Sequence, residues 1–489
     1  MRSLIVAACL LPACDRVFLD ELPPEVTVSY EVREVRNAPD GTPATTVVSD
    51  PRFFEVVLAD GSMPSLVTRN EGALTFVRGS EQEPYRLAVR MPNDQVVEYQ
   101  LATPSVSIVD AVIGRNDRAP PAGWNVRQLV PNAPANTTSY LVTTGLWTET
   151  PHTAAQSGTT NMSFQFEWPN ARRKFGAAGI LAAPNGDRAY ATSSVFGPGK
   201  RGAPYFSISH ICEDTFETLG LTVDIELQCN VAPIATDRCL HLQTAFAAEL
   251  DRIAEVLPPI AHLTKHHGWF VGAAPAPELA PQVTLDLASG FAFTDAAKPA
   301  TETDDELSYG NPFPGHAVNL KMVASHERPY TDPKATSHTN LETRTRYWTA
   351  PAPTCGTPEP VPSLVAIPHG VLVDEMPLDE DGRIVATDPA RDLRVTWSDS
   401  AGSVDFYRVV LTEVAEFLTF TIRVPRRTYV VTERTVLVDP NLLQPTKTYV
   451  IEVEAHAGAP NARRGEFGTH DPAAPYAIGS GWSSTFQVP

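Results

Sequence analysis

The stretch LQPTKTYVIEVEA, residues 443–455, decides the fold class expected for this chain. Apolar and polar side chains alternate through Tyr449, Ile451 and Val453, and a two-residue period is that of a strand with one buried face. Two strand-like runs precede it, one at 393–397 with Trp397 on the expected buried face and one at 406–411. We therefore expect residues 356–489 to form a β-sandwich.

The 443–455 segment resembles the part of fibronectin type III domains that carries their characteristic tyrosine. The resemblance implies that Tyr449 begins a strand and that its hydroxyl bonds to nearby backbone. It also implies that Trp397 is a core residue of an earlier strand and that 483–488 is the closing strand. Domains of this type are usually spacers or binding modules, although a fold alone proves neither function.

The remainder of the chain also favours strands. The 45 prolines among 489 residues are spread along its whole length, and proline breaks helix interiors but is tolerated at turns and sheet edges. We predict a mainly β, multidomain protein of β-sandwich modules, with a small sandwich at 26–115 and a middle β-rich domain at 116–355 that opens with a linker at 116–136. Strands near Gly72–Phe76 and Tyr85–Val89 resemble carboxypeptidase-regulatory-like and transthyretin-like domains.

One segment of the middle domain follows a helical period instead. Phe246, Leu250, Ile253 and Leu257 recur with the spacing of one helix face, which predicts an amphipathic helix over about 237–257. Thr236 and Asp237 are the expected caps, and the Pro258–Pro259 pair ends the helix.

The N-terminus carries an export signal. Arg2 supplies a positive start, 4–11 is apolar, and Leu11-Pro12-Ala13-Cys14 resembles the lipobox of bacterial lipoproteins. The resemblance implies a signal peptide at 1–13, lipidation of Cys14 and a tether at 14–25. No apolar run reaches the ~18 residues of a membrane-spanning helix. We expect a bacterial cell-envelope protein held by its lipid at a membrane and facing the periplasm or the cell surface. The alternatives are an ordinary secretory signal and an N-terminus of no special meaning, as in a cytoplasmic protein.

Charge excludes one class of partner. The chain has 57 acidic and 38 basic residues, a net charge of −19. Such a surface repels phosphate backbones, so we expect no nucleic-acid partner.

The cysteines predict disulfides. Cys212, Cys229, Cys239 and Cys355 remain once Cys9 and Cys14 are set aside, and an even number in an exported chain favours two disulfides with three possible connectivities. If all four pair, Cys355 must reach back to the 212–239 region. A zinc site that includes His241 is the alternative, but the spacing contains no C-x-x-C pair.

Few residues suggest chemistry, and we predict no catalytic residue. His262 and His266 would share one helix face and suit a metal ion, but they lack the glutamate of an H-E-x-x-H motif. The Gly-Pro-Gly-Lys-Arg-Gly run at 197–202 lacks the spacing of a phosphate-binding loop and is expected to be a surface loop. We predict no cofactor and expect the acidic loop after residue 373 to be a solvated loop. Calcium is the alternative there, bound by Asp374, Asp379, Asp381 and Asp388.

The combination of a lipid tether, sandwich modules and no recognisable active site predicts a non-catalytic protein. Its role would be binding, adhesion or envelope architecture, with the membrane as one partner and a protein or polysaccharide as another. The alternative is an envelope hydrolase with an active site within 120–355, where His262, His266 and an acid would converge in a pocket.

Overall fold

The computed structural model describes residues 24–38, 40, 42–48, 54–70, 72–90, 96–113, 125–131, 137–142, 147–150, 161–167, 188–214, 225–228, 231–257, 264–279, 285–291, 300–329, 340–349, 355–356, 365–417, 420–468 and 475–489. The described chain is mainly β, as the alternation predicts, and its one α-helix is α2 (Phe246–Val256). None of the described helices is long and apolar enough to cross a membrane. Cys14, the predicted lipidation site, lies outside these residues.

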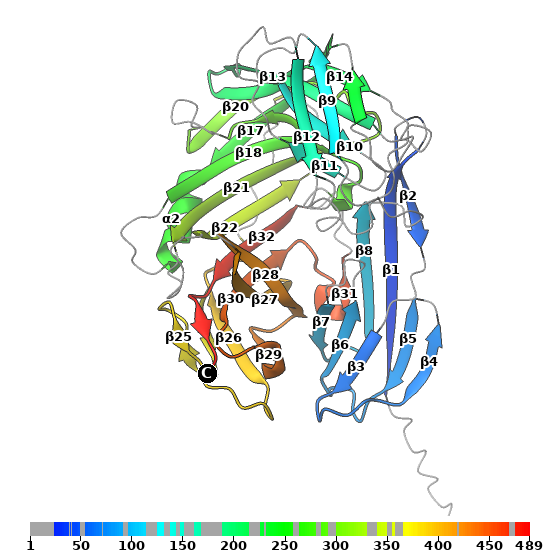
Figure 1. The fold of residues 1–489 in the computed structure, drawn as a ribbon, viewed down its shortest axis with the longest axis vertical. Helices are drawn as coiled ribbons and strands as arrows, with labels where there is room; N and C mark the ends of the chain where they lie inside the picture. Colours follow the sequence, from blue (N-terminus) through cyan, green and yellow to red (C-terminus); the bar gives the residue numbers. More distant parts are fainter. Residues whose placement is uncertain are drawn as a thin grey trace, which may run out of the picture.

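The N-terminal region is a sandwich of two sheets (Figure 1). In one sheet β1 pairs antiparallel with β2 and β5 and parallel with β8; in the other β6 lies between β3 and β7. Alternate residues such as Val26 and Val28 of β1 and Leu87 of β6 are fully buried between the sheets. The strands are β1 (Glu25–Asn37), β2 (Pro43–Val48), β3 (Phe54–Leu58), β4 (Leu66–Asn70), β5 (Ala73–Val77), β6 (Tyr85–Arg90), β7 (Val96–Leu101) and β8 (Ser105–Ile113).

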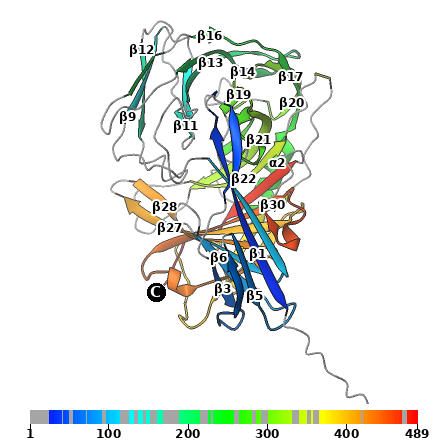
Figure 2. The ribbon, with the colours of Figure 1, turned by 90° about the vertical axis from the view of Figure 1, so that its right-hand side faces the viewer.

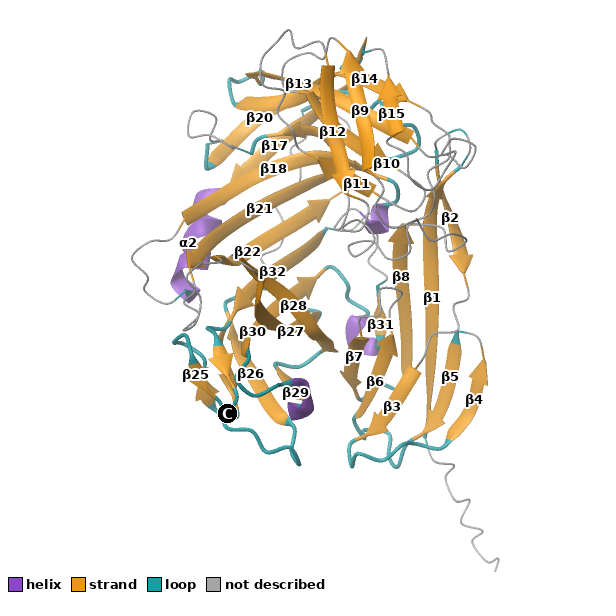
Figure 3. Ribbon diagram, viewed as in Figure 1, coloured by secondary structure: helices purple, strands orange, loops and turns teal. Residues whose placement is uncertain are grey.

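The middle region contributes the largest sheet, in which β18, β21 and β22 pair antiparallel and α2 lies against β21 and β22 (Figure 3). The long β1 reaches this region, where Val35 joins the core that holds Leu285 and Phe313 (Figure 2). The strands are β9 (Asn125–Pro131), β10 (Thr137–Val142), β11 (Trp147–Thr150), β12 (Asn161–Glu167), β13 (Arg188–Pro198), β14 (Pro204–Asp214), β15 (Ile225–Gln228), β16 (Ala232–Pro233), β17 (Arg238–Ala245), β18 (Thr264–Ala274), β19 (Leu285–Ser289), β20 (Glu302–Tyr309), β21 (Ala317–Pro329) and β22 (Asn340–Thr349).

The C-terminal region is a second sandwich. One sheet has the order β24-β23-β26-β29, and the facing strands run β28-β27-β30-β32. The strands are β23 (Pro368–Val373), β24 (Met376–Pro377), β25 (Arg383–Ile384), β26 (Leu393–Asp399), β27 (Phe406–Phe417), β28 (Phe420–Val431), β29 (Thr435–Val438), β30 (Thr448–Ala457), β31 (Glu466–Phe467), β32 (Tyr476–Trp482) and β33 (Phe486–Gln487).

Two aromatic residues of this sandwich have the environment that the sequence motif implies. Trp397 on β26 is 5% exposed and meets the ring of Tyr407 edge-on, with 5.1 Å between centroids. Tyr449 at the start of β30 is fully buried, and its hydroxyl accepts a hydrogen bond from the backbone N–H of Gln444 at 2.7 Å. This bond fixes the chain as it enters β30.

The three regions share their sheets. β22 of the middle region pairs antiparallel with β32 of the C-terminal sandwich, from Arg344–Ser480 to Trp348–Tyr476. β28 of that sandwich pairs parallel with β7 of the N-terminal sandwich, and the short β31 pairs parallel with β8. The largest sheet therefore runs through all three regions (Figure 1).

The predicted helix is too long at its N-terminal end. Residues 238–245 form β17, which pairs antiparallel with β20, and α2 begins only at Phe246. The reason is the alternation of the fully buried Leu240 and Leu242, which has the period of a strand. Thr236 and Asp237 therefore cap no helix, and the helix ends before Leu257.

The predicted linker is wrong, and the predicted closing strand is confirmed only in part. Residues 125–131 within the linker form β9, which pairs with β12 and β15. Within 483–488 only Phe486–Gln487 is a strand, β33, which pairs antiparallel with the start of β30; most of β30 pairs with β32 instead. A Cβ on Gly479 or Gly481 of β32 would lie about 2 Å from the carbonyl oxygen of Ala366 or Pro368, so both positions require glycine. Glycine is unfavourable in strands, and for this reason the sequence did not indicate a strand here.

Candidate functional site

Of the two predicted histidines, the structure describes only His266. His266 lies on the strand β18 (Thr264–Ala274) and not on a helix, as the prediction required; His262 lies outside the described residues. His266 Nε2 is 3.5 Å from a carboxylate oxygen of Glu327 on the neighbouring β21. Across the described part of the chain, no three histidine, cysteine or acidic side chains gather in a way that would hold a metal ion.

The four aspartates of the acidic loop are each held by a different partner. Asp374 pairs with Arg391 at 2.9 Å, whereas Asp379 pairs with Arg383 at 3.0 Å. The other two accept backbone hydrogen bonds, Asp381 from Thr485 and Asp388 from Ala390. The aspartates thus stabilise separate turns, and they do not converge on one point.

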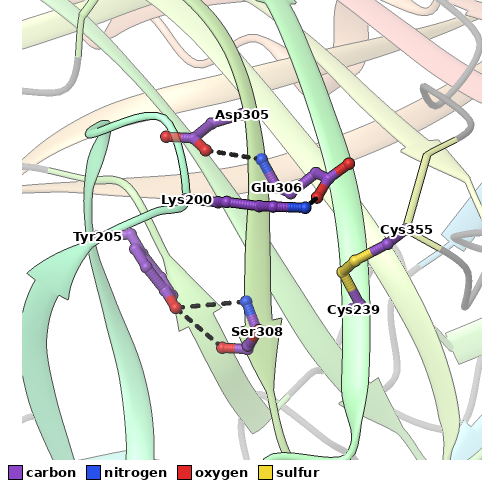
Figure 4. Close-up of a disulfide and its surroundings, with 7 residues drawn as sticks. All are labelled: Lys200, Tyr205, Cys239, Asp305, Glu306, Ser308 and Cys355. Atoms are coloured by element: carbon purple, nitrogen blue, oxygen red, sulfur yellow. Dashed lines mark hydrogen bonds and ion pairs between the residues drawn. A yellow bond between two sulfur atoms is a disulfide. The ribbon is translucent and has the colours of Figure 1, made fainter.

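One of the predicted disulfides joins distant parts of the middle region. Cys239 on β17 is bonded to Cys355, 116 residues later (Figure 4). Cys212 on β14 is also in a disulfide, and Cys229 lies outside the described residues. His241, the histidine of the alternative zinc site, is 2.6 Å from Asp304 through Nε2. A disulfide sulfur is not a thiolate ligand, so the zinc alternative is wrong.

The glycine-rich run at 197–202 is a hairpin loop between β13 and β14. The buried carboxylate of Asp305 accepts hydrogen bonds from the backbone N–H groups of Arg201 at 2.6 Å and Ala203 at 2.7 Å. Lys200 pairs with Glu306 at 2.5 Å (Figure 4). An internal carboxylate therefore occupies the N–H groups that a bound phosphate would need.

A dense set of titratable side chains lies across four neighbouring strands of the large sheet, in the order β22, β32, β30 and β27. We call it the charge cluster; its residues are Arg344, Arg346, Arg408, Glu452, Glu454 and His456. Alternation along each strand places these side chains on the sheet face opposite the sandwich core, because Ile451, Val453 and Ala455 between them are buried in that core.

Glu454 is the centre of the charge cluster. Its side chain is 4% exposed, and its two oxygens pair with Arg346 at 2.8 Å and Arg408 at 2.9 Å. His456 Nε2 lies 3.5 Å from the second oxygen, and its Nδ1 is 2.5 Å from the Tyr476 hydroxyl. The Phe406 ring stacks on the imidazole at 4.4 Å. Glu454 thus bridges the middle region, through Arg346, to the C-terminal sandwich.

The two carboxyls of the charge cluster have opposite pKa shifts. Burial raises the pKa of Glu452 to about 7, and the nearby charge of Glu454 adds to the rise. Burial also favours the neutral form of Glu454, but Arg408, His456 and Arg346 together hold its pKa well below the ordinary value. Burial lowers the pKa of His456. Near neutral pH, Glu454 is therefore ionised and Glu452 changes protonation. Separated pKa values of this kind also occur in acid–base pairs of enzymes.

The charge cluster was not predicted from the sequence, although charged residues at alternate positions of two strands pointed to it. Arg344-x-Arg346 and Glu452-x-Glu454-x-His456 place charges at alternate positions of two strands whose other residues are apolar or small. When two strands lie in the same sheet, charged residues at every second position of each strand point to one face of the sheet, where opposite charges can pair. The shared sheet itself was not predicted, so this pairing was missed.

A cavity of about 270 Å³ lies on the other face of β22, beneath α2, and we call it the α2 cavity. Its walls are largely apolar and include Phe246, Met322 and Tyr347. Polar groups lie at its border, where Arg252 pairs with Glu249 at 2.5 Å and donates to the backbone oxygen of Val365 at 2.6 Å. A space of this size and lining suits a small, mainly apolar ligand.

Comparisons with known proteins identify no family. No protein-family model matches the chain, and neither does any curated protein. Among solved structures, one neighbour is the Escherichia coli alpha-2-macroglobulin activated by porcine elastase, with 9% identity and a TM-score of 0.14. The alignment covers 95% of this chain and 43% of that one, so the chain spans less than half the length of the structure it matches. A TM-score this low supports no argument about fold or function.

Proposed function

We propose that this chain is a non-catalytic protein of the bacterial cell envelope, anchored by a lipid on Cys14, that serves in binding, adhesion or envelope architecture. The observation that carries the proposal is the sharing of sheets. Pairing of β22 with β32 and of β7 with β28 joins the three regions edge to edge. Modules joined in this way hold a fixed arrangement, as an architectural or binding protein requires.

The electrostatics of the charge cluster also favour a structural role. Glu454 is engaged by two arginines, and Glu452, Glu454 and His456 do not line the α2 cavity. A catalytic carboxylate must reach its substrate within hydrogen-bond distance. The buried, ion-paired Glu454 holds strands together instead. The ligand would be a protein or a polysaccharide of the envelope.

Lipidation is tested by expressing the full chain in bacteria with radiolabelled palmitate. The wild type is expected to incorporate label and to fractionate with membranes, because two or more acyl chains anchor a protein durably. Cys14→Ser is expected to lose both properties. Cys9→Ser, the matched control within the signal peptide, is expected to keep them. An unlabelled wild type would contradict the anchor.

An envelope hydrolase is the second candidate, and one observation favours it. Glu452, whose pKa is raised to about 7, lies beside the ionised Glu454, so the pair would offer both an acid and a base near neutral pH. This site would lie at the edge of the middle region, where β32 lies between β22 and β30, instead of at His262 and His266.

Incubation of the protein with isolated cell-wall material distinguishes the non-catalytic binding protein from the hydrolase. The non-catalytic proposal predicts that wild type and Glu452→Gln co-sediment with the material equally and that neither releases sugar or peptide fragments over hours. Release of fragments by the wild type that disappears in Glu452→Gln would establish the hydrolase and contradict the first proposal.

A further inference from the structure

A buried arginine without an acidic partner lies between the middle region and the C-terminal sandwich. Arg328, near the end of β21, is 5% exposed. Its guanidinium donates to the backbone oxygen of Ser483 at 2.9 Å, more weakly to that of Trp482 at 3.5 Å, and to the Ser484 hydroxyl at 3.4 Å. A guanidinium carries more N–H donors than these bonds use.

The charge of Arg328 is not balanced locally. Among the described residues, no carboxylate lies within ion-pairing distance of its guanidinium, in contrast to Arg346 and Arg408 of the charge cluster. Burial lowers the pKa of Arg328, and the charge of Asp381 offsets this only in part. Asp381 itself accepts hydrogen bonds from Thr485. Buried charges in proteins are normally paired, so an unpaired one suits a ligand of opposite charge.

Arg328 lines a cavity of about 270 Å³, which we call the Arg328 cavity. Thr343 and Ser484 add hydroxyl groups to its wall. The rest of the wall is mostly apolar and includes Leu257, Val371, Leu378 and Trp482. These residues come from the end of α2, the β23–β24 hairpin and β32. The guanidinium and the two hydroxyls thus share one space with the apolar wall, with His369, and with Asp379, which pairs with Arg383.

We infer that the Arg328 cavity binds a small monocarboxylate with a short apolar body. A carboxylate accepts two parallel hydrogen bonds from a guanidinium, and one negative charge balances one arginine. A phosphate dianion would exceed this charge, and the carboxylate of Asp379 at the cavity wall would repel it further. The apolar wall and the small volume select a body of a few carbon atoms. This inference does not depend on the proposed function.

The chemistry is tested first on the wild-type full chain, by calorimetric titration with sodium butyrate, its uncharged amide butyramide, and inorganic phosphate. Butyrate is expected to bind at least about tenfold more tightly than butyramide, because hydrogen bonds to a charged group are worth more than those to a neutral one. Phosphate is expected to bind more weakly than butyrate. Equal affinity for butyrate and butyramide, no binding of either, or tighter binding of phosphate would each overturn the inference.

The location is tested with Arg328→Met, which keeps an unbranched apolar stem and removes the charged guanidinium. It is expected to weaken butyrate binding at least about tenfold and to leave butyramide unaffected. Arg394→Gln removes a charge from an exposed arginine on β26 and is expected to bind butyrate as the wild type does. Unchanged butyrate binding by Arg328→Met would overturn the assignment. If this variant does not fold, the wild type is treated with phenylglyoxal, which modifies guanidinium groups, with and without butyrate. Butyrate is expected to protect Arg328 from modification, and lack of protection would overturn the assignment.

Discussion

The C-terminal sandwich is joined to its two neighbours by junctions of different construction. At the β22–β32 junction with the middle region, the pairing is antiparallel, and the buried Glu454 bridges Arg346 of one region and Arg408 of the other. One hydrophobic core continues through this junction, with Tyr347 of β22 and Ala477 of β32 both in it. Sheet, core and ion pairs all cross at the same place.

The β7–β28 junction with the N-terminal sandwich has a longer ion pair across it, between Arg427 of β28 and Glu98 of β7 at 4.0 Å. Its strands are parallel, and the amide of Gln100 exchanges hydrogen bonds with the backbone of Leu437 at 2.6 and 2.9 Å. Arg86 pairs with Asp392 where both side chains are about a quarter exposed. The N-terminal core is separate from the main one, although Val430 and Phe467 of the C-terminal region enter it.

The difference between the two junctions predicts which regions unfold together. Removing one partner of a buried ion pair is costly because it leaves an uncompensated charge, whereas exposed pairs contribute little. We therefore expect the middle region and the C-terminal sandwich to unfold together, and the N-terminal sandwich to separate from them more easily.

The largest effect is expected at Glu454. Glu454→Gln leaves the largely buried Arg346 and the partly exposed Arg408 without their shared carboxylate and should lower the free energy of unfolding by about 3–5 kcal/mol. Urea unfolding followed by tryptophan fluorescence measures it. The matched control, Glu433→Gln in an exposed turn, should change stability by less than about 0.5 kcal/mol. Similar small effects of both variants would show that the β22–β32 junction does not depend on the ion pairs.

Next in size is the Cys239–Cys355 disulfide, which constrains the middle region without touching the β7–β28 junction. Replacing both cysteines by serine should cost about 2–4 kcal/mol, because the bond closes a long loop in the unfolded chain. Denaturant titration under non-reducing conditions is the measurement. Reduction of the wild type should lower the stability of the middle region likewise, while a stability independent of both treatments would argue against this pairing.

Glu452 should give a pH-dependent effect of up to about 3 kcal/mol. Its folded-state pKa is raised from 4.5 to about 7, so it stabilises the fold fully below pH 4.5 and loses this contribution as the pH rises toward 7. The lowered pKa of His456 acts in the opposite direction, so the comparison with Glu452→Gln isolates the effect. Thermal melts from pH 4.5 to 7.5 should show the wild type losing stability relative to the variant. Parallel curves would contradict the raised pKa.

The smallest effect is expected at the β7–β28 junction. Asp392→Asn removes the partner of Arg86 in a half-buried pair and should cost no more than about 1 kcal/mol. Calorimetry should show a lower transition temperature for the N-terminal sandwich alone. A loss as large as that of Glu454→Gln would remove the contrast between the two junctions.

The sequence predicted strands wherever apolar residues alternate on one face, as around Val26 and Tyr449, because this pattern depends only on neighbours along the chain. It did not predict β32, whose glycines are required by the carbonyl groups of Ala366 and Pro368 in the facing sheet. It also extended α2 across Leu240 and Leu242, where partner strand β20 decides the conformation. The charge cluster escaped notice for the same reason, since Arg346 and Glu454 are 108 residues apart and meet only through strand pairing.

Hydrogen exchange across the β22–β32 junction tests the central claim most directly. If these strands pair as described, backbone amides in 344–348 and 476–480 should be protected together, for as long as those of the interior strands β27 and β30. Exchange of both segments at the rate of unpaired chain, while β27 and β30 stay protected, would show that the middle region and the C-terminal sandwich do not share a sheet.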